Sequence, residues 1–265
     1  MQILGTSPEI VFDRVYPFEL GYLRYLLNWA LILEKDFPTD ANLNSYSNIP
    51  APTQAVGPFP YEASQFWDGK KLWPLCFQTA WREFSRTATA RMRAGGSDAP
   101  LIYYAEKAPH CVPAFLGRAM AYRSILLVRD PRDIFLSITA FDKKRGFPGF
   151  NRRATDDDWS YAQRFVDDCR KPMKRIMEAE ADPDNILMKY EVLVLDLANE
   201  SQRLGQHLGV KFDVGMIDRQ RLEFHTTSNT ASESVERWRR ELPPELNEFF
   251  VSNLHEELKH FGYDA

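Results

Sequence analysis

Three short apolar runs without alternation predict buried strands beyond residue 100. They are Leu101–Ala105, Ser124–Val128 and Asn185–Tyr190, and none shows the alternating polar positions of a half-exposed strand. Each run is followed by a segment whose apolar residues have helical spacing. Strands of this kind, each followed by a helix, predict an α/β fold in which a parallel sheet is flanked by helices.

Apolar residues spaced by threes and fours predict the helices. Between the first two, the stretch Phe37–Gly69 contains five prolines, which exclude a continuous helix or a central strand. A stretch of that length is either a functional lid or binding loop, or an insertion that only covers the surface. We expect one domain over residues 1–265 with this Pro-rich insertion. The predicted helices are Pro17–Lys35, Phe77–Arg93, Val112–Tyr122, Pro131–Phe141, Trp159–Ala181, Val192–Leu208 and Pro244–His260.

Composition restricts the class of protein and its compartment. With 44% hydrophobic and 26% charged residues, the 265-residue chain has a globular composition, which excludes a disordered or collagen-like protein. A net charge of −4 argues against binding nucleic acid through overall basicity. The three cysteines lack CxxC spacing, and no apolar run reaches the ~20 residues of a membrane span. We therefore expect a soluble, cytoplasmic protein without a structural zinc site.

A basic side chain and a hydroxyl accompany the helix that follows Ser124–Val128. Arg129 comes directly after this strand, and Asp130 with Pro131 forms a typical helix N-cap and first helical residue. Ser137 lies about two turns into the same predicted helix. A guanidinium, a hydroxyl and a helix N-terminus together suit a phosphate group. In the competing interpretation, Arg129 pairs with a neighbouring aspartate and Ser137 faces solvent.

The ends of the other two predicted strands carry further candidates. Tyr190 ends the third run, where a tyrosine either stacks on a nucleobase or is simply a core residue. Lys107 and His110 follow the first run, where a lysine can neutralise developing negative charge and a histidine can act as a general base. A salt bridge and a helix-capping histidine are the competing interpretation for this pair.

The chain resembles the sulfotransferases that use 3′-phosphoadenosine 5′-phosphosulfate (PAPS). The similar segments are Leu126–Ser137 to the family's 3′-phosphate motif, Lys189–Leu193 to its Tyr-Glu-Asp-Leu segment, Glu106–Pro109 to its Glu-Lys-Ser/Thr-Pro segment and Ser232–Leu242 to its C-terminal Trp-Arg element. Agreement in order and spacing covers most of Tyr103–Tyr263. The resemblance implies a P-loop-NTPase-like sulfotransferase fold with PAPS as co-substrate and no metal.

The resemblance also implies which residues bind the nucleotide. Arg129 and Ser137 match the residues that grip the 3′-phosphate, and Tyr190 matches a tyrosine near the adenine. Arg237 and Trp238 belong to the element that closes over the nucleotide.

The catalytic and acceptor-binding residues are a second set of expectations. Lys107 matches the lysine of the family's motif, and His110, one position from the family's histidine, is the candidate base. Arg14 and Glu19 are the candidates for contacting the acceptor. We expect a small-molecule, carbohydrate or lipid acceptor and no nucleic-acid partner.

One part of the family's pattern is missing from this sequence. The family holds the 5′-phosphosulfate in an N-terminal Pro-Arg/Lys-Ser-Gly-Thr-Thr loop, and no such loop is present. Gln2–Val11 instead resembles the segment after the loop helix, so we expect an N-terminally truncated form of the fold. Two functions follow. The chain is either a sulfotransferase acting on a hydroxyl or amine, or a catalytically impaired or non-catalytic nucleotide-binding or interaction protein derived from that fold.

Overall fold

The computed structural model describes residues 1–12, 21–31, 33, 69–96, 98–108, 115–217, 230 and 232–264. The chain divides into two compact units. The first comprises Met1 and Ile3–Tyr122, and the second comprises Gln2 and Arg123–Ala265. Each unit has its own cluster of buried apolar side chains.

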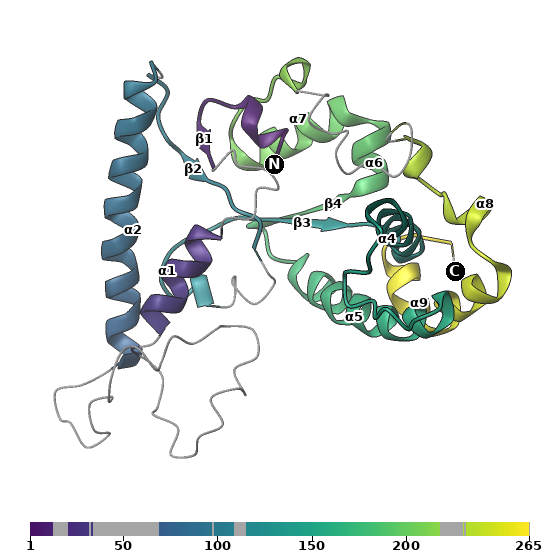
Figure 1. The fold of residues 1–265 in the computed structure, drawn as a ribbon. Helices are drawn as coiled ribbons and strands as arrows, with labels where there is room; N and C mark the ends of the chain where they lie inside the picture. The colour runs from purple at the N-terminus through teal and green to yellow at the C-terminus, as the bar shows by residue number, and fades with distance from the viewer. Residues whose placement is uncertain are drawn as a thin grey trace, which may run out of the picture. The chain divides into compact units, whose positions relative to one another are not determined.

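The first unit combines two helices with a pair of short parallel strands (Figure 1). Its strands β1 and β2 pair in the register Ile10 opposite Tyr103. Its helices α1 and α2 enclose an apolar cluster around Leu27, Trp73 and Phe77, all of which are at most 2% exposed. The elements are a 3₁₀ turn at Leu4–Thr6, β1 at Ile10–Val11, α1 at Tyr22–Leu31, α2 at Gly69–Ala94 and β2 at Tyr103–Tyr104.

The second unit is organised around two parallel strands, β3 at Ser124–Val128 and β4 at Asn185–Lys189 (Figure 1). Their register places Ser124 opposite Asn185 and Val128 opposite Lys189. Both strands therefore end at the same edge of the sheet, and the residues that follow them become neighbours. This edge is where ligands bind in parallel α/β sheets.

Aromatic packing holds the helices of the second unit together. Phe135 of α4, Tyr161 and Phe165 of α5 and Phe250 of α9 form one cluster with ring centroids 5.4–6.2 Å apart. All four side chains are at most 5% exposed, so they stabilise the second unit mainly by burying apolar surface. The helices of this unit are α4 at Pro131–Arg145, α5 at Asp158–Ala179, α6 at Tyr190–Leu195, α7 at Leu197–Leu208, α8 at Trp238–Glu241 and α9 at Pro244–His260, with 3₁₀ turns at Val214–Met216 and Ser232–Ser234.

The predicted α/β fold with parallel strands is confirmed. The strand predicted over Ser124–Val128 and the helix predicted over Pro244–His260 have the bounds expected from the sequence. The helix predicted to end at Phe141 continues to Arg145, and Gly146 with φ 80° ends it in the left-handed conformation. Within the described ranges, none of the helices has the length and apolar composition needed to cross a bilayer.

Three helix predictions are wrong in their bounds. The helix expected over Val192–Leu208 is two helices, because the Asp196 side chain accepts from the Asn199 amide and starts a new one. The helix expected to begin at Phe77 begins at Gly69 and continues through Pro74. It is therefore longer than α5, the helix predicted from Trp159. In the described part of the segment expected to be helical over 112–122, only residues 115 and 116 are helical. The predicted insertion over residues 37–68 lies outside the described residues.

Candidate functional site

The parallel register of β3 and β4 brings two predicted site residues into contact. Arg129 directly follows Val128, and Tyr190 directly follows Lys189, its partner in the register. The Arg129 guanidinium carbon lies 4.3 Å from the centre of the Tyr190 ring. This cation–π contact places a permanent positive charge beside an aromatic face at the ligand-binding edge of the sheet.

The Arg129 side chain retains capacity for hydrogen bonding. Its Nη2 donates to the Ser234 carbonyl oxygen at 3.0 Å, and the Tyr190 hydroxyl lies 3.1 Å from Ser234 Oγ. Its Nε is buried and has no hydrogen-bond partner among the described residues. A buried, unpaired guanidinium nitrogen costs free energy unless a ligand acceptor reaches it. The arrangement therefore suits an anion that brings its own oxygens.

Helix α4 begins at this edge as the sequence predicted. The Asp130 side chain caps the helix by accepting from the Arg132 amide at 2.9 Å, and Pro131 is the first helical residue. The positive end of the helix dipole therefore lies at the ends of the strands, which favours negative charge there. Ser137 is half-buried two turns into the same helix.

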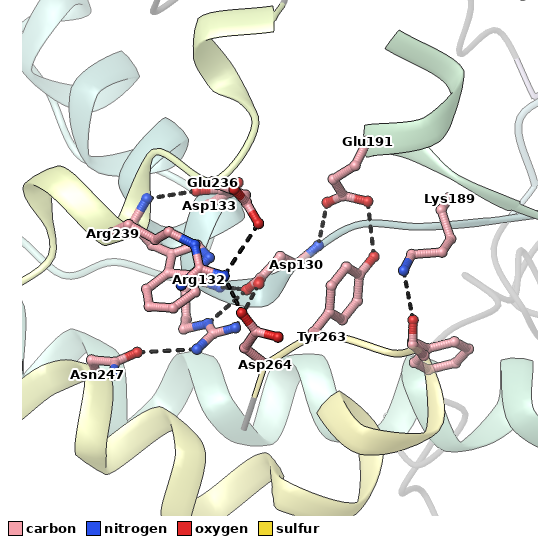
Figure 2. Close-up of polar contacts among 12 residues, drawn as sticks. Asp130, Arg132, Asp133, Lys189, Glu191, Glu236, Arg239, Asn247, Tyr263 and Asp264 are labelled. Carbon is pink, nitrogen blue, oxygen red and sulfur yellow. Dashed lines mark hydrogen bonds and ion pairs between the residues drawn. The ribbon is translucent and has the colours of Figure 1, made fainter. Parts of the chain in front are cut away.

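The neighbouring arginine, Arg132, is fully engaged inside the protein. It is 1% exposed, and its Nε and Nη2 donate to both carboxylate oxygens of Asp130 at 3.0 and 2.8 Å. Its Nη1 donates to Asn247 Oδ1 at 3.1 Å, and its guanidinium lies 3.6 Å from the centre of the Trp238 ring (Figure 2). The ion pair of Asp130 is therefore made with Arg132, which leaves Arg129 to the ligand edge.

A second carboxylate supports the same strand end. The Glu191 side chain accepts from the Asp130 amide at 2.8 Å through Oε1 and from the Tyr263 hydroxyl at 3.0 Å through Oε2 (Figure 2). Lys189 Nζ donates to the Phe261 carbonyl at 2.7 Å and lies 4.5 Å from the centre of the Tyr263 ring. The chain after α9 is thereby fixed against the ends of both strands.

Asp133, in the first turn of α4, holds the segment that carries Trp238. Its Oδ1 accepts from the Trp238 amide at 2.9 Å, and its Oδ2 is buried with no partner among the described residues. Burial and, to a smaller extent, the charge of Asp130 raise the pKa of Asp133 to about 6, although the Trp238 amide and Arg129 act in the opposite direction. The carboxylate is therefore part of the electrostatics around Arg129.

Of the remaining predicted site residues, Trp238 contacts Arg132 and Asp133 as described above, and the structure also describes Arg237 and Lys107. Arg237 forms an ion pair with Glu241 at 2.7 Å. Lys107 belongs to the first unit, where its side chain is exposed. The adjacent Glu106 accepts from the Leu23 amide at 2.7 Å, at the start of α1. His110, Arg14 and Glu19 lie outside the described residues.

Sequence reasoning missed four residues whose hydrogen bonds hold the segments around the ends of β3 and β4 in place. They are Arg132, Asp133, Glu191 and Tyr263. Apart from the Asp130 carboxylate that binds Arg132, their polar partners are distant in sequence or are backbone groups. A signal existed only for Asp133, as an acidic residue in the first turn of a predicted helix. Within the described ranges, no cluster of three or more His, Cys, Asp or Glu side chains could hold a metal ion.

Two of the solved structures that match this chain share limited similarity with it. One is the sulfotransferase domain of the Synechococcus PCC 7002 olefin synthase, at 17% identity over 100% of this chain and 89% of that one, with a TM-score of 0.49. The other is retinol dehydratase in complex with androsterone and the inactive cofactor PAP, at 15% identity over 100% of this chain and 84% of that one, with a TM-score of 0.41. The sequence matches none of the curated proteins with which it was compared.

The family match rests on sequence and covers the strand ends described above. Residues 108–262 match the family model described as the sulfotransferase domain, which is more than half of the chain. The match includes Arg129, Ser137 and Tyr190. It supports sulfotransferase activity in general and does not favour a non-catalytic binding protein. The chain belongs to the sulfotransferase domain family.

Proposed function

We propose that this protein transfers the sulfuryl group of PAPS to a hydroxyl or amine acceptor. The observation that carries the proposal is that Arg129 Nε, at the strand edge beside the start of α4, is buried and has no hydrogen-bond partner in the part of the chain that the structure describes. An anion with several oxygens is the ligand chemistry that satisfies such a nitrogen. The 3′-phosphate of PAPS is that anion in the family to which the chain belongs.

The residues at the edge fit a 3′-phosphoadenosine. Arg129 supplies a charged donor, Ser137 a hydroxyl on the helix that follows, and Tyr190 an aromatic face for the base. The Ser234 carbonyl, which now accepts from Arg129 Nη2, is a neutral acceptor that a phosphate oxygen can replace. Arg237 and Trp238 complete the proposed nucleotide-binding set, because they lie on the segment that Asp133 holds at this edge.

The proposed chemistry beyond nucleotide binding involves four further residues. The acceptor gains the sulfuryl group and 3′-phosphoadenosine 5′-phosphate leaves, while Lys107 neutralises the negative charge that develops on transfer and His110 takes the acceptor proton. Arg14 and Glu19 contact the acceptor, which we propose to be a small molecule, a carbohydrate or a lipid. The reaction requires no metal, and the scarcity of cysteine favours the cytoplasm as its place.

Calorimetry with two nucleotides tests the phosphate site. We expect 3′-phosphoadenosine 5′-phosphate (PAP) to bind more tightly than adenosine 5′-phosphate, and Arg129→Ala to weaken PAP binding by roughly ten- to hundredfold, because a charge-assisted pair is lost. Ser137→Ala should cost less, since it removes a neutral group. Arg203→Ala is the matched control, because Arg203 is a partly exposed arginine of the same unit that pairs with Glu200. Equal PAP affinity of wild type and Arg129→Ala would refute the assignment.

The second test measures the reaction itself. Sulfate transfer from labelled PAPS to a panel of phenols, sugars and lipids should proceed in wild type and fall in Arg129→Ala at PAPS concentrations below saturation. Transfer that is unaffected by Arg129→Ala would show that another part of the chain binds the 3′-phosphate. Tight PAP binding with no transfer to any acceptor class would contradict the proposed activity.

A further inference from the structure

We propose that Glu191 is a positioning residue that fixes Arg129 for the 3′-phosphate, with Tyr263 fixing Glu191 in turn. The inference rests on the proposed function, because it assigns a support to the proposed phosphate-binding arginine. It concerns two residues that belong to neither the proposed nucleotide-binding set nor the proposed acceptor-binding set.

The first step of the argument is the peptide group between Arg129 and Asp130. The Asp130 amide belongs to that peptide, and it donates to Glu191 Oε1 at 2.8 Å. Because a peptide group is planar, fixing its amide hydrogen also fixes the carbonyl carbon and the Cα of Arg129. Asp130 is 3% exposed and Glu191 9% exposed, so water does not readily replace this bond. The carboxylate thereby sets the direction in which the Arg129 side chain leaves the backbone.

The second step is what holds Glu191. Its Oε2 accepts from the Tyr263 hydroxyl at 3.0 Å, and the Tyr263 ring lies against Lys189, whose Nζ binds the Phe261 carbonyl (Figure 2). Burial and the adjacent Glu191 charge raise the pKa of Tyr263, so its hydroxyl remains a donor in the ordinary pH range. Both carboxylate oxygens of Glu191 therefore accept a hydrogen bond, one from the Asp130 amide and one from the Tyr263 hydroxyl.

The third step is the cost of losing this support. Arg129 reaches only one backbone carbonyl with Nη2, and its Nε makes no hydrogen bond among the described residues. The Tyr190 ring, whose centre lies 4.3 Å from the guanidinium carbon, is a further contact but fixes no hydrogen-bond direction, so part of the orientation of the guanidinium depends on the peptide. A side chain that has to be ordered on binding loses affinity, which preorganisation prevents. Loss of Glu191 should consequently reduce the binding that the 3′-phosphate contributes and spare that of the adenosine.

The test compares two affinities in each variant. Calorimetry measures PAP and adenosine 5′-phosphate, and their ratio isolates the contribution of the 3′-phosphate. Glu191→Leu should lower this ratio by about tenfold, because it removes the charged acceptor of the Asp130 amide. Tyr263→Phe should lower it by about threefold, because it removes only the hydrogen bond that holds Glu191. Glu191→Gln should keep most of the ratio, because its amide oxygen still accepts from the Asp130 amide. A purely structural role would lower the melting temperature and leave the ratio of the folded protein unchanged.

A variant at a buried tyrosine of the same unit is the matched control, and specific results in each variant would contradict the proposal. Tyr161→Phe removes a buried hydroxyl of the same unit, one that donates to the Phe150 carbonyl at 2.9 Å, and should leave the ratio unchanged. A folded Glu191→Leu with the wild-type ratio overturns the proposal. If Glu191→Leu does not fold, Tyr263→Phe decides, and an unchanged ratio overturns it. If the preference for PAP over adenosine 5′-phosphate falls in Arg129→Ala but not in the Glu191 and Tyr263 variants, the proposed function stands and the role of Glu191 is refuted. If wild type shows no preference for PAP, both proposals are refuted.

Discussion

Replacing Arg132 by methionine tests how strongly the network behind the site stabilises the fold. The Arg132 side chain is 1% exposed and donates to both oxygens of Asp130 and to Asn247. Methionine has a similar length and retains apolar contact with Trp238, so the change removes mainly charge and hydrogen bonds. The variant leaves the Asp130 carboxylate buried, with the backbone amide of residue 132 as its remaining donor from that residue.

The expected loss of stability follows from the buried Asp130 carboxylate, which the variant leaves without its charged partner. Removing one partner of a buried ion pair leaves an uncompensated charge and costs ~3–5 kcal/mol of unfolding free energy. Adding Asp130→Asn to Arg132→Met should recover at least about half of this loss, because the amide oxygen can still cap α4 without a net charge. The coupling free energy of the pair should accordingly be about 2 kcal/mol or more.

Urea unfolding followed by circular dichroism provides the measurement. Wild type, the two single variants and the double variant form one cycle, and Asp167→Asn is the control. Asp167 pairs with Arg170 at 2.7 Å, but its side chain is 70% exposed, so its loss should change stability by less than about 1 kcal/mol. A loss below about 1 kcal/mol in Arg132→Met, or no recovery in the double variant, would refute the reasoning, because a buried unpaired carboxylate must be costly.

Two further predictions concern carboxylates in different units. The folded-state pKa of Asp133 is raised from 3.8 to about 6, so the folded state binds its proton more tightly and the contribution of Asp133 to stability falls as the pH rises through that window. Asp133→Asn should therefore stabilise the protein more at about pH 7.5 than at about pH 4 in urea unfolding, and an equal effect at both values would contradict this. In the first unit, Glu106→Ala should speed amide exchange at Leu23 and Arg24, whose amides bind its carboxylate at 2.7 and 3.3 Å, and unchanged exchange rates would contradict a capping role.

Local patterns along the chain were sufficient to predict the parts of the site that depend on neighbouring residues. The apolar run Ser124–Val128 predicted β3, and Asp130 with Pro131 predicted the start of α4. The parallel arrangement then placed Arg129 and Tyr190 at one edge before any contact was known. The bounds of β3 and the start of α4 were predictable because apolar runs, helix capping and proline geometry are properties of a few adjacent residues. The expected burial of the whole strand is wrong, since Val128 is buried but Leu127 is 53% exposed.

The failures depend on partners that are distant in sequence. Residue type alone does not distinguish Arg129 from Arg132, because Asp130 lies beside both in sequence, and two of the contacts that bury Arg132 come from Trp238 and Asn247, more than 100 residues further along. The same holds for the Tyr263 hydroxyl, which meets Glu191 across 72 residues. The break at Asp196 was missed for another reason: an aspartate inside an amphipathic pattern either faces solvent or starts a helix, and only its bond to the Asn199 side chain and amide decides.

The two arginines around Asp130 have different tasks because their charges are compensated differently. Arg132 is matched inside the protein by the Asp130 carboxylate and the Asn247 amide, so it has little to offer an incoming anion. Arg129 faces a ring and a neutral carbonyl, and neither cancels its charge. An anion that reaches Arg129 therefore replaces one neutral acceptor and gains a full charge interaction, whereas at Arg132 it would have to displace a carboxylate. If the proposed function holds, this asymmetry makes nucleotide affinity depend on Arg129, whereas the geometry of the strand end depends on Arg132.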